Sequence, residues 1–163
     1  MLRISRSSQG TTLRPVELKA AMICDAASVR EGLLHVLGGG ITRIWRQELP
    51  APLGVALAVI VDLSPDVVFD AHEVTVAFVR DDDNMQINEV KGAFQVGPEL
   101  RLEPGEHQLV PIVFDLHGAI VDQYGAYTFH IAIDFIPATA LRFWVLHPEE
   151  QLLPLIPPLD PES

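Results

Sequence analysis

Residues 20–52 read AAMICDAASVREGLLHVLGGGITRIWRQELPAP, and the pattern in and around this stretch decides the fold. Apolar and polar side chains alternate over residues 17–24, which is typical of a strand. A polar turn is expected over residues 25–32, because Arg-Glu-Gly breaks the pattern there. The alternation predicts a second strand at residues 33–37 and a third extended piece at residues 41–45.

Three consecutive glycines, Gly38, Gly39 and Gly40, separate the second and third pieces. Glycine within an extended segment marks a bulge, a sharp bend or a close approach of two backbones. A glycine run can also form an anion-binding nest, but no helix opening with Lys-Ser/Thr follows, as a phosphate loop requires. We therefore expect a bend, with the third piece ending at Pro50 and Pro52 because proline cannot donate to a sheet.

The most apolar stretch downstream is residues 55–61, VALAVIV. Both faces of this segment are apolar, so it predicts a central strand that is covered on both sides. Residues 72–80 alternate, and residues 87–96 place Val90, Phe94 and Val96 on one face; Asp81-Asp82-Asp83-Asn84 between the two segments has the composition of a turn. The two segments therefore predict a hairpin.

Three more strands are expected before the C-terminus. Residues 107–116 contain Pro111, which favours an edge strand or a bulge. Residues 124–136 alternate best, and the Gly-x-Tyr at their start resembles the tyrosine corner of sandwich domains. Residues 140–147 complete the set. The side chains expected to point inward from residues 124–136 are Tyr127, Phe129, Ile131, Ile133 and Phe135.

No helical period persists anywhere in the chain. The fold class is therefore all-β: a single antiparallel β-sandwich of about eight strands, immunoglobulin-like or C2-like. We assign residues 17–147 to this domain. Residues 1–16, rich in Ser, Thr and Arg, are expected to be a flexible tail, and residues 148–163 form a Pro- and Leu-rich C-terminal segment.

The overall composition narrows the classes of partner. The 163 residues carry a formal net charge of −11, with 48% hydrophobic and 20% charged residues, as in globular proteins. A surface with this much negative charge repels phosphates and anionic lipids. Neither nucleic acid nor a membrane is therefore expected as a partner. The single cysteine excludes an internal disulfide. With no signal-peptide pattern and no membrane-spanning apolar run, we expect a cytoplasmic location.

The N-terminal half resembles an uncharacterised bacterial β-sandwich family, a domain of unknown function. Its pattern is A-x-x-C-D, a Gly-containing turn, a glycine bend, an aromatic residue and a proline exit. The resemblance spans roughly residues 18–147 and implies the sandwich fold, with no known activity to transfer. The residues that carry it are Ala21, Cys24, Asp25, Gly32, Gly38–Gly40, Trp45 and Pro50, with Gly92, Phe94, Val96 and residues 124–129 further on.

Catalytic chemistry finds little support in the sequence. Cys24 alternates onto the apolar side of its strand, so we expect a buried, inert thiol. No Gly-x-Ser-x-Gly occurs, and no histidine pair has metal-ligand spacing. We expect no catalytic residue, no cofactor and no enzyme activity; a hydrolase or isomerase would need a dispersed set of convergent polar groups. The histidines are expected at the surface or at loop ends: His35, His72, His107, His117, His130 and His147.

Acidic loops offer one weak candidate for a metal site, made of Asp81, Asp82, Asp83 and Asp122. If successive loops alternate between the ends of the sandwich, these four carboxylates share one end. Carboxylates from neighbouring loops can bind calcium, as in calcium-dependent membrane-binding sandwiches. The alternative is ordinary solvated turn chemistry.

The C-terminal segment supplies candidates for partner binding, because a purely disordered tail usually lacks large aliphatic residues. We expect the segment to pack on its own domain or on a neighbouring chain. The sequence thus favours a non-catalytic module for protein interaction or assembly, with self or with an unknown partner. The alternative is a sandwich that binds a cation or small ligand at its acidic end. The partner-binding candidates are Leu152, Leu153, Leu155 and Ile156.

Overall fold

The computed structural model describes residues 14–149, which form twelve strands. The expectation of about eight strands is too low, because five of the twelve have only two to five residues. The strands are β1 (Val16–Cys24), β2 (Ala26–Arg30), β3 (Leu33–Leu37), β4 (Arg43–Trp45), β5 (Ala51–Pro52), β6 (Ala56–Leu63), β7 (His72–Arg80), β8 (Met85–Phe94), β9 (Gln108–Asp115), β10 (Ile120–Val121), β11 (Gly125–Ile133) and β12 (Ile136–Leu146).

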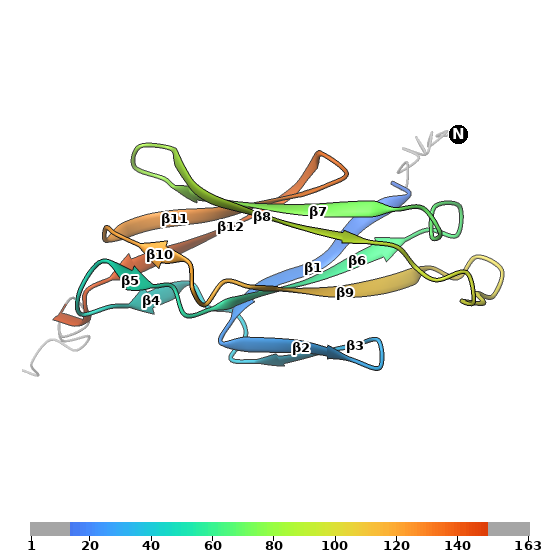
Figure 1. Ribbon diagram of the computed structural model, residues 1–163, viewed down its shortest axis with the longest axis horizontal. Coiled ribbons are helices and arrows are strands. Elements are labelled where there is room, and N and C mark those ends of the chain that lie inside the picture. The colour runs from blue at the N-terminus through green and yellow to red at the C-terminus, as the bar shows by residue number, and fades with distance from the viewer. Residues whose placement is uncertain (1–13, 150–163) are drawn as a thin grey trace, which may run out of the picture.

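The architecture is a β-sandwich, as predicted. A three-stranded sheet, in the order β1-β6-β9, faces a five-stranded sheet, in the order β4-β12-β11-β7-β8 (Figure 1). Strands β5 and β10 form a small pair at one end, and β2 and β3 form a hairpin outside the three-stranded sheet. The expectation of purely antiparallel pairing is wrong at one place, because β4 pairs in parallel with β12. The chain leaves the outer hairpin through the glycine run and then enters the five-stranded sheet as β4, which runs parallel to β12.

The core fills the space between the two sheets. Its centre is a cluster of aromatic rings from β7, β11 and β12 whose centroids lie between 5.0 and 6.0 Å apart. Tyr127, Phe129 and Phe143 are completely buried. Tyr127 Oη also donates a hydrogen bond to the carbonyl of Gln123 at 2.7 Å, which confirms the expected tyrosine corner.

Strand β6 is the central strand that its sequence predicted. It lies between β1 and β9, and its inward side chains Leu57, Val59 and Val61 join the main core. On its other face, Ala56 and Ala58 form a second small cluster with Cys24. The β2–β3 hairpin packs on this cluster, which explains why both faces of β6 are apolar.

The alternation along β1 is interrupted by a bulge between Leu18 and Ala20. Leu18 and Ile23 both pack with the main core, although a regular strand would place them on opposite faces. Cys24 instead faces the outer cluster and is fully buried, as expected for the thiol. A period-two pattern does not reveal the extra residue of a bulge, so the alternation predicted the wrong face for several residues of β1.

The turn between β11 and β12 also differs from the prediction. Asp134 and Phe135 form its two-residue loop, with φ values of 49° and 66°, which suits a tight hairpin. Phe135 was expected to point inward, but 83% of its surface is exposed. The strand ends two residues earlier than the alternating pattern suggests.

The edge-strand prediction for Pro111 is confirmed, because β9 is an outer strand of the three-stranded sheet. Pro111 lies opposite Ile60 of β6. The expected hairpin of residues 72–96 is present as β7 and β8, joined through Asp81–Asn84.

Candidate functional site

The acidic end of the sandwich is held together by a buried arginine. Arg80, at the end of β7, is only 7% exposed. Its Nη1 donates to Asp122 Oδ1 at 2.8 Å, and its Nε and Nη2 donate to the two oxygens of Asp83 at 3.0 and 2.7 Å. The structure thus brings Asp83 and Asp122 to one end, as expected from the alternation of loops, but around a guanidinium.

The carboxylate of Asp81, another of the four acidic candidates, also contacts side chains of the protein. It accepts a hydrogen bond from Thr128 Oγ1 and forms an ion pair with Nε of Arg142, both at 2.8 Å. The hydrogen bond from Arg80 lowers the pKa of Asp83, and the pKa of Arg80 is raised in turn. Over residues 14–149, no group of three or more His, Cys, Asp or Glu side chains could hold a metal ion.

Arg80 was missed as a site residue, although the sequence carries a signal for it. It continues the inward row of Val74, Val76 and Phe78 on β7, so the alternation places a charge on the apolar face. A buried guanidinium needs acidic partners, and the nearest acidic loops are the ones that the structure supplies.

His72 lies at a loop end, where β7 begins, which fits the expectation of surface or loop-end histidines, but its side chain is buried. It is 6% exposed, and its Nδ1 lies 2.7 Å from Asp134 Oδ2 while its Nε2 lies 2.9 Å from the carbonyl of Val67. Both ring nitrogens face acceptors, so the protonated imidazolium satisfies the site best. Burial lowers the pKa of His72, but the bonds to Asp134 and Val67 outweigh it and the pKa is raised. The pair joins the loop before β7 to the β11–β12 turn.

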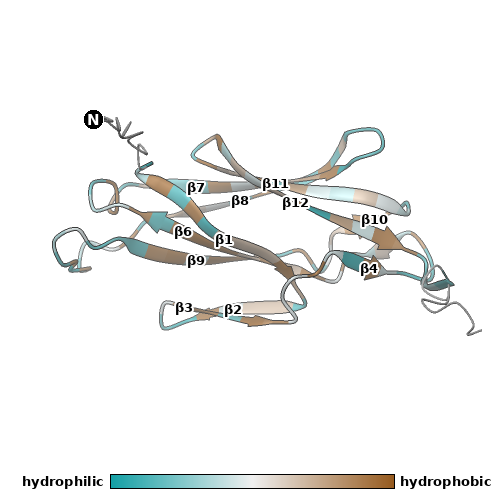
Figure 2. Cartoon of the chain, turned by 180° about the vertical axis from the view of Figure 1, so that it is seen from behind, coloured by the Kyte–Doolittle hydropathy of each residue, from teal (hydrophilic) through white to brown (hydrophobic). Residues whose placement is uncertain are grey.

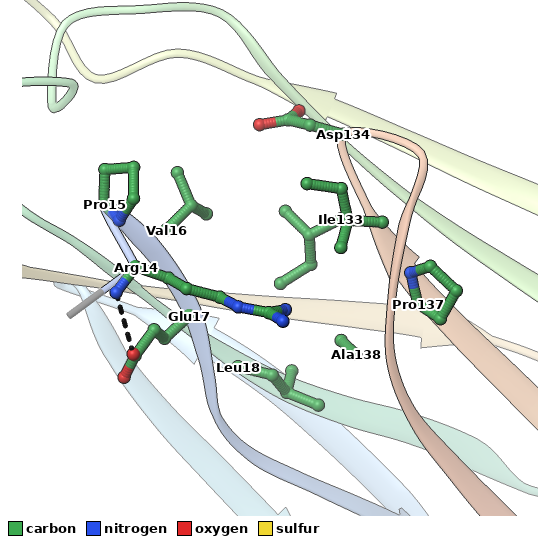
Figure 3. A pocket seen from close by; sticks show the side chains of 10 residues that line it. Arg14, Pro15, Val16, Glu17, Leu18, Ile133, Asp134, Pro137 and Ala138 are labelled. Atoms are coloured by element: carbon green, nitrogen blue, oxygen red, sulfur yellow. Dashed lines mark hydrogen bonds between the residues drawn. The ribbon is translucent and has the colours of Figure 1, made fainter. Parts of the chain in front are cut away.

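A pocket lies beside this turn, between β1 and the start of β12 (Figure 3). Its volume is about 470 Å³, and its walls are mainly aliphatic, with the guanidinium of Arg14 reaching across it. The acidic side chains at its rim are Glu17 and Asp134, and the latter already binds His72. Among residues 14–149, the lining contains no serine, cysteine or histidine, the usual members of a nucleophile–base pair.

The β2–β3 hairpin is the largest departure from the sequence prediction in this region, because residues 26–30 were expected to be a turn. They form β2, and the real turn is Glu31-Gly32 with positive φ at both positions. A two-residue turn of this kind matches the twist of paired strands. Ala27 and Leu34 on the inner face of the hairpin pack on the Cys24 cluster.

The remaining large apolar side chains of this hairpin are exposed, and Figure 2 shows brown, apolar segments along it. Leu33 and Leu37 lie on the outer face and are 63% and 69% exposed. Val29 and Val36 share the inner face with Ala27 and Leu34, yet are 42% and 38% exposed. We call Val29, Leu33, Val36 and Leu37 the hairpin surface.

The glycine run closes the hairpin, as the predicted bend. Gly38 and Gly40 have φ values of 62° and 88°, which favour glycine. The amides of Gly40 and Ile41 both donate to the carbonyl of Ile23, at 2.9 and 3.0 Å. These bonds fix the path by which the chain leaves the hairpin, so the orientation of the hairpin surface is set by backbone contacts.

The partner-binding candidates Leu152, Leu153, Leu155 and Ile156 lie outside the described residues. Within residues 14–149, the structure contains no helix with the length and apolar character needed to cross a membrane.

Comparison with known proteins identifies the family of this chain but provides no activity for it. A search of curated proteins finds no match to the chain. The family model that does match covers residues 19–146, from β1 to the end of β12. This match spans most of the sequence, and the chain belongs to a family of unknown function, DUF6941.

Proposed function

We propose that the protein is a non-catalytic module for protein interaction or assembly, and that it binds through the hairpin surface. The observation that carries this proposal is the exposure of Leu33 and Leu37 on a hairpin outside the sandwich core. Contiguous exposed apolar groups on a folded protein commonly mark a contact surface.

The hairpin has an anchored face and an open face. Its inner face is fixed on the sandwich by Ala27 and Leu34, so the hairpin is presented in one orientation. A two-stranded hairpin is marginal when isolated, and covering its open face by a partner would stabilise it further. Burying a leucine side chain contributes about 1.5–3 kcal/mol, so Leu33 and Leu37 could supply much of a moderate affinity.

The chemistry of the hairpin points to a partner with an apolar contact face. His35 lies between the two leucines on β3, and Arg30 lies opposite Leu33 on β2. A partner with aliphatic side chains and a carboxylate near Arg30 would complement this surface. A second copy of the chain meets the apolar requirement, and its Glu31, beside Arg30, would meet the charge requirement.

The proposal is tested with the double variant Leu33→Ser, Leu37→Ser. Both side chains are mostly exposed, so the variant is expected to fold with little change in thermal stability. Light scattering over a range of concentrations measures self-association, and a pull-down with the immobilised full chain measures binding to other proteins. We expect the double variant to lose the association that the original chain shows.

Phe135→Asn is the matched control, because it removes an even more exposed apolar side chain from the far β11–β12 turn. Asparagine also tolerates the positive φ of this position. Equal association by the double variant and the original chain would refute the hairpin surface as the contact. A monomeric chain that captures no protein would refute the proposed function itself.

A further inference from the structure

Both tryptophans of the chain lie at one edge of the five-stranded sheet, on its outer face. Strand β4 pairs in parallel with β12, so Arg43 lies beside Trp144 and Trp45 lies beside Leu146. The residues between them, Ile44 and Val145, are buried in the main core. Because successive side chains point to opposite faces, Arg43, Trp45 and Trp144 face away from the core.

This edge also carries two arginines. The guanidinium of Arg142 lies 5.2 Å from the centre of the Trp144 ring, in a cation–π contact, and its Nε forms an ion pair with Asp81 at 2.8 Å. Arg43 is exposed, and among residues 14–149 it takes part in no ion pair. Trp144 is 38% exposed, although indole rings are usually well covered. We call Arg43, Trp45, Arg142 and Trp144 the tryptophan ledge.

The segment that follows β12 has the complementary composition. The described chain ends at Glu149, five residues after Trp144. Residues 150–163, EQLLPLIPPLDPES, contain four prolines, five large aliphatic residues, three acidic residues and no basic one. Proline-rich segments bind aromatic surfaces in the extended polyproline conformation, because little conformational entropy is lost.

The length of this segment is sufficient. At about 3.1 Å per residue in the polyproline conformation, fourteen residues reach about 43 Å. Two neighbouring strands lie only about 4.8 Å apart, so the segment can turn back after β12 and cross both β12 and β4. The charge also favours this contact, since the exposed Arg43 forms no ion pair among residues 14–149 and can attract the carboxylates of the segment.

We propose that residues 150–163 pack on the tryptophan ledge of their own chain. The prolines and aliphatic side chains of the segment cover Trp45 and Trp144, and its carboxylates lie near Arg43. The inference does not depend on the hairpin surface, which lies on the other sheet's side of the sandwich. The C-terminal segment would then cover a surface of its own chain, and the hairpin surface would remain exposed for binding partner proteins.

The two tryptophans are themselves the reporters. In full-length chain carrying Trp45→Phe, Trp144 is the only source of tryptophan fluorescence. Quenching by acrylamide measures the access of solvent to its ring. The test compares this chain with the same chain carrying Leu155→Asp and Ile156→Asp, and with the chain carrying Arg43→Glu. Because covering half of an exposed ring halves its collisions with quencher, we expect either change to raise quenching about two-fold.

Arg101→Glu is the control for charge, because Arg101 is an exposed arginine in the loop before β9. It should leave quenching unchanged. The Leu155→Asp, Ile156→Asp variant changes the C-terminal segment, and Arg43→Glu changes the tryptophan ledge. Circular dichroism verifies that each variant is folded. Unchanged quenching in the folded Leu155→Asp, Ile156→Asp chain would overturn the proposal.

Two further measurements decide which chain supplies the segment. Quenching is measured over a hundred-fold dilution, and protection that disappears on dilution would overturn the intramolecular form in favour of a second copy. A spin label on Leu159→Cys should broaden the indole N–H signals of Trp45 and Trp144 in a dilute sample, while Cys24 is buried and does not take up label. Sharp indole signals would also overturn the proposal.

Discussion

At the scale of single residues, His72 is the clearest source of pH dependence. Its pKa is raised in the folded protein by Asp134 and Val67, against the effect of burial. A raised folded pKa stabilises the protein fully below the unfolded value of about 6.5, and this contribution is lost as the pH rises through the folded pKa.

We therefore expect the free energy of unfolding to fall as the pH rises from 6 toward 9, by about 1–3 kcal/mol for loss of a charge-assisted hydrogen bond. Urea denaturation at a series of pH values measures this change. His117 has a raised pKa for similar reasons and contributes in the same direction. The variant Asp134→Asn separates the contributions of the two histidines, because it should remove only the part of the pH dependence that is due to His72. An unaltered pH profile in that variant would contradict the assignment.

Gly39 is a second residue whose role is steric. A Cβ at this position would lie 2.9 Å from Met22 Sδ and 3.2 Å from Val36 Cγ1. We expect Gly39→Val to lower the free energy of unfolding by about 1–3 kcal/mol through overpacking between β1 and the hairpin. Thermal and urea unfolding measure it. Gly118→Val is the control, since nothing lies within 4 Å of its added Cβ; similar losses in both variants would contradict the packing argument.

At the scale of elements, the β7–β8 turn and the loop before β11 form one cross-linked unit around Arg80. The guanidinium occupies the oxygens of Asp83 and Asp122 that a calcium ion would need. We expect no change in Tm on adding millimolar calcium or a chelator, measured by differential scanning fluorimetry. A rise of several degrees with calcium would show that the acidic end binds the ion despite Arg80.

The sequence predicted those elements whose own side chains indicate burial. Residues 55–61, apolar on both faces, correspond to β6, and the alternating residues 124–136 contain β11, because local burial dominates there. It missed β2, since residues 26–30 are few, include only one β-branched side chain, and become a strand by pairing with β3. Register shifts such as the bulge in β1 depend on the partner strand, which the local pattern does not contain.

The candidate sites were predictable only in part, for the same reason. The sequence placed Asp81–Asp83 and Asp122 together correctly, but Arg80 pairs with a residue 42 positions away and His72 with one 62 positions away. Contacts at such separations arise from the packing of the sheets. The exposure of Leu33 and Leu37 likewise depends on which face of the hairpin the sandwich covers.

At the scale of the whole molecule, the two sheets bury their shared core, and the outside carries two apolar surfaces of different character. The hairpin surface is aliphatic and stands apart from the sandwich, and the tryptophan ledge is aromatic and cationic. We infer that the first binds partner proteins and that the second is covered by the C-terminal segment. This division explains how one chain of net charge −11 can present separate apolar contacts.

The most direct test of partner binding places a photoreactive phenylalanine analogue at position 37, on the hairpin surface, and at position 135 as the control. Both positions are largely exposed, so cross-linking reports proximity to a partner and not general access. Irradiation is carried out in the cells that make the protein, and the products are identified by mass spectrometry. The account predicts a discrete protein cross-link from position 37, to a second copy or to one other protein, and none from position 135. Equal cross-linking from both positions, or none from position 37, would contradict it.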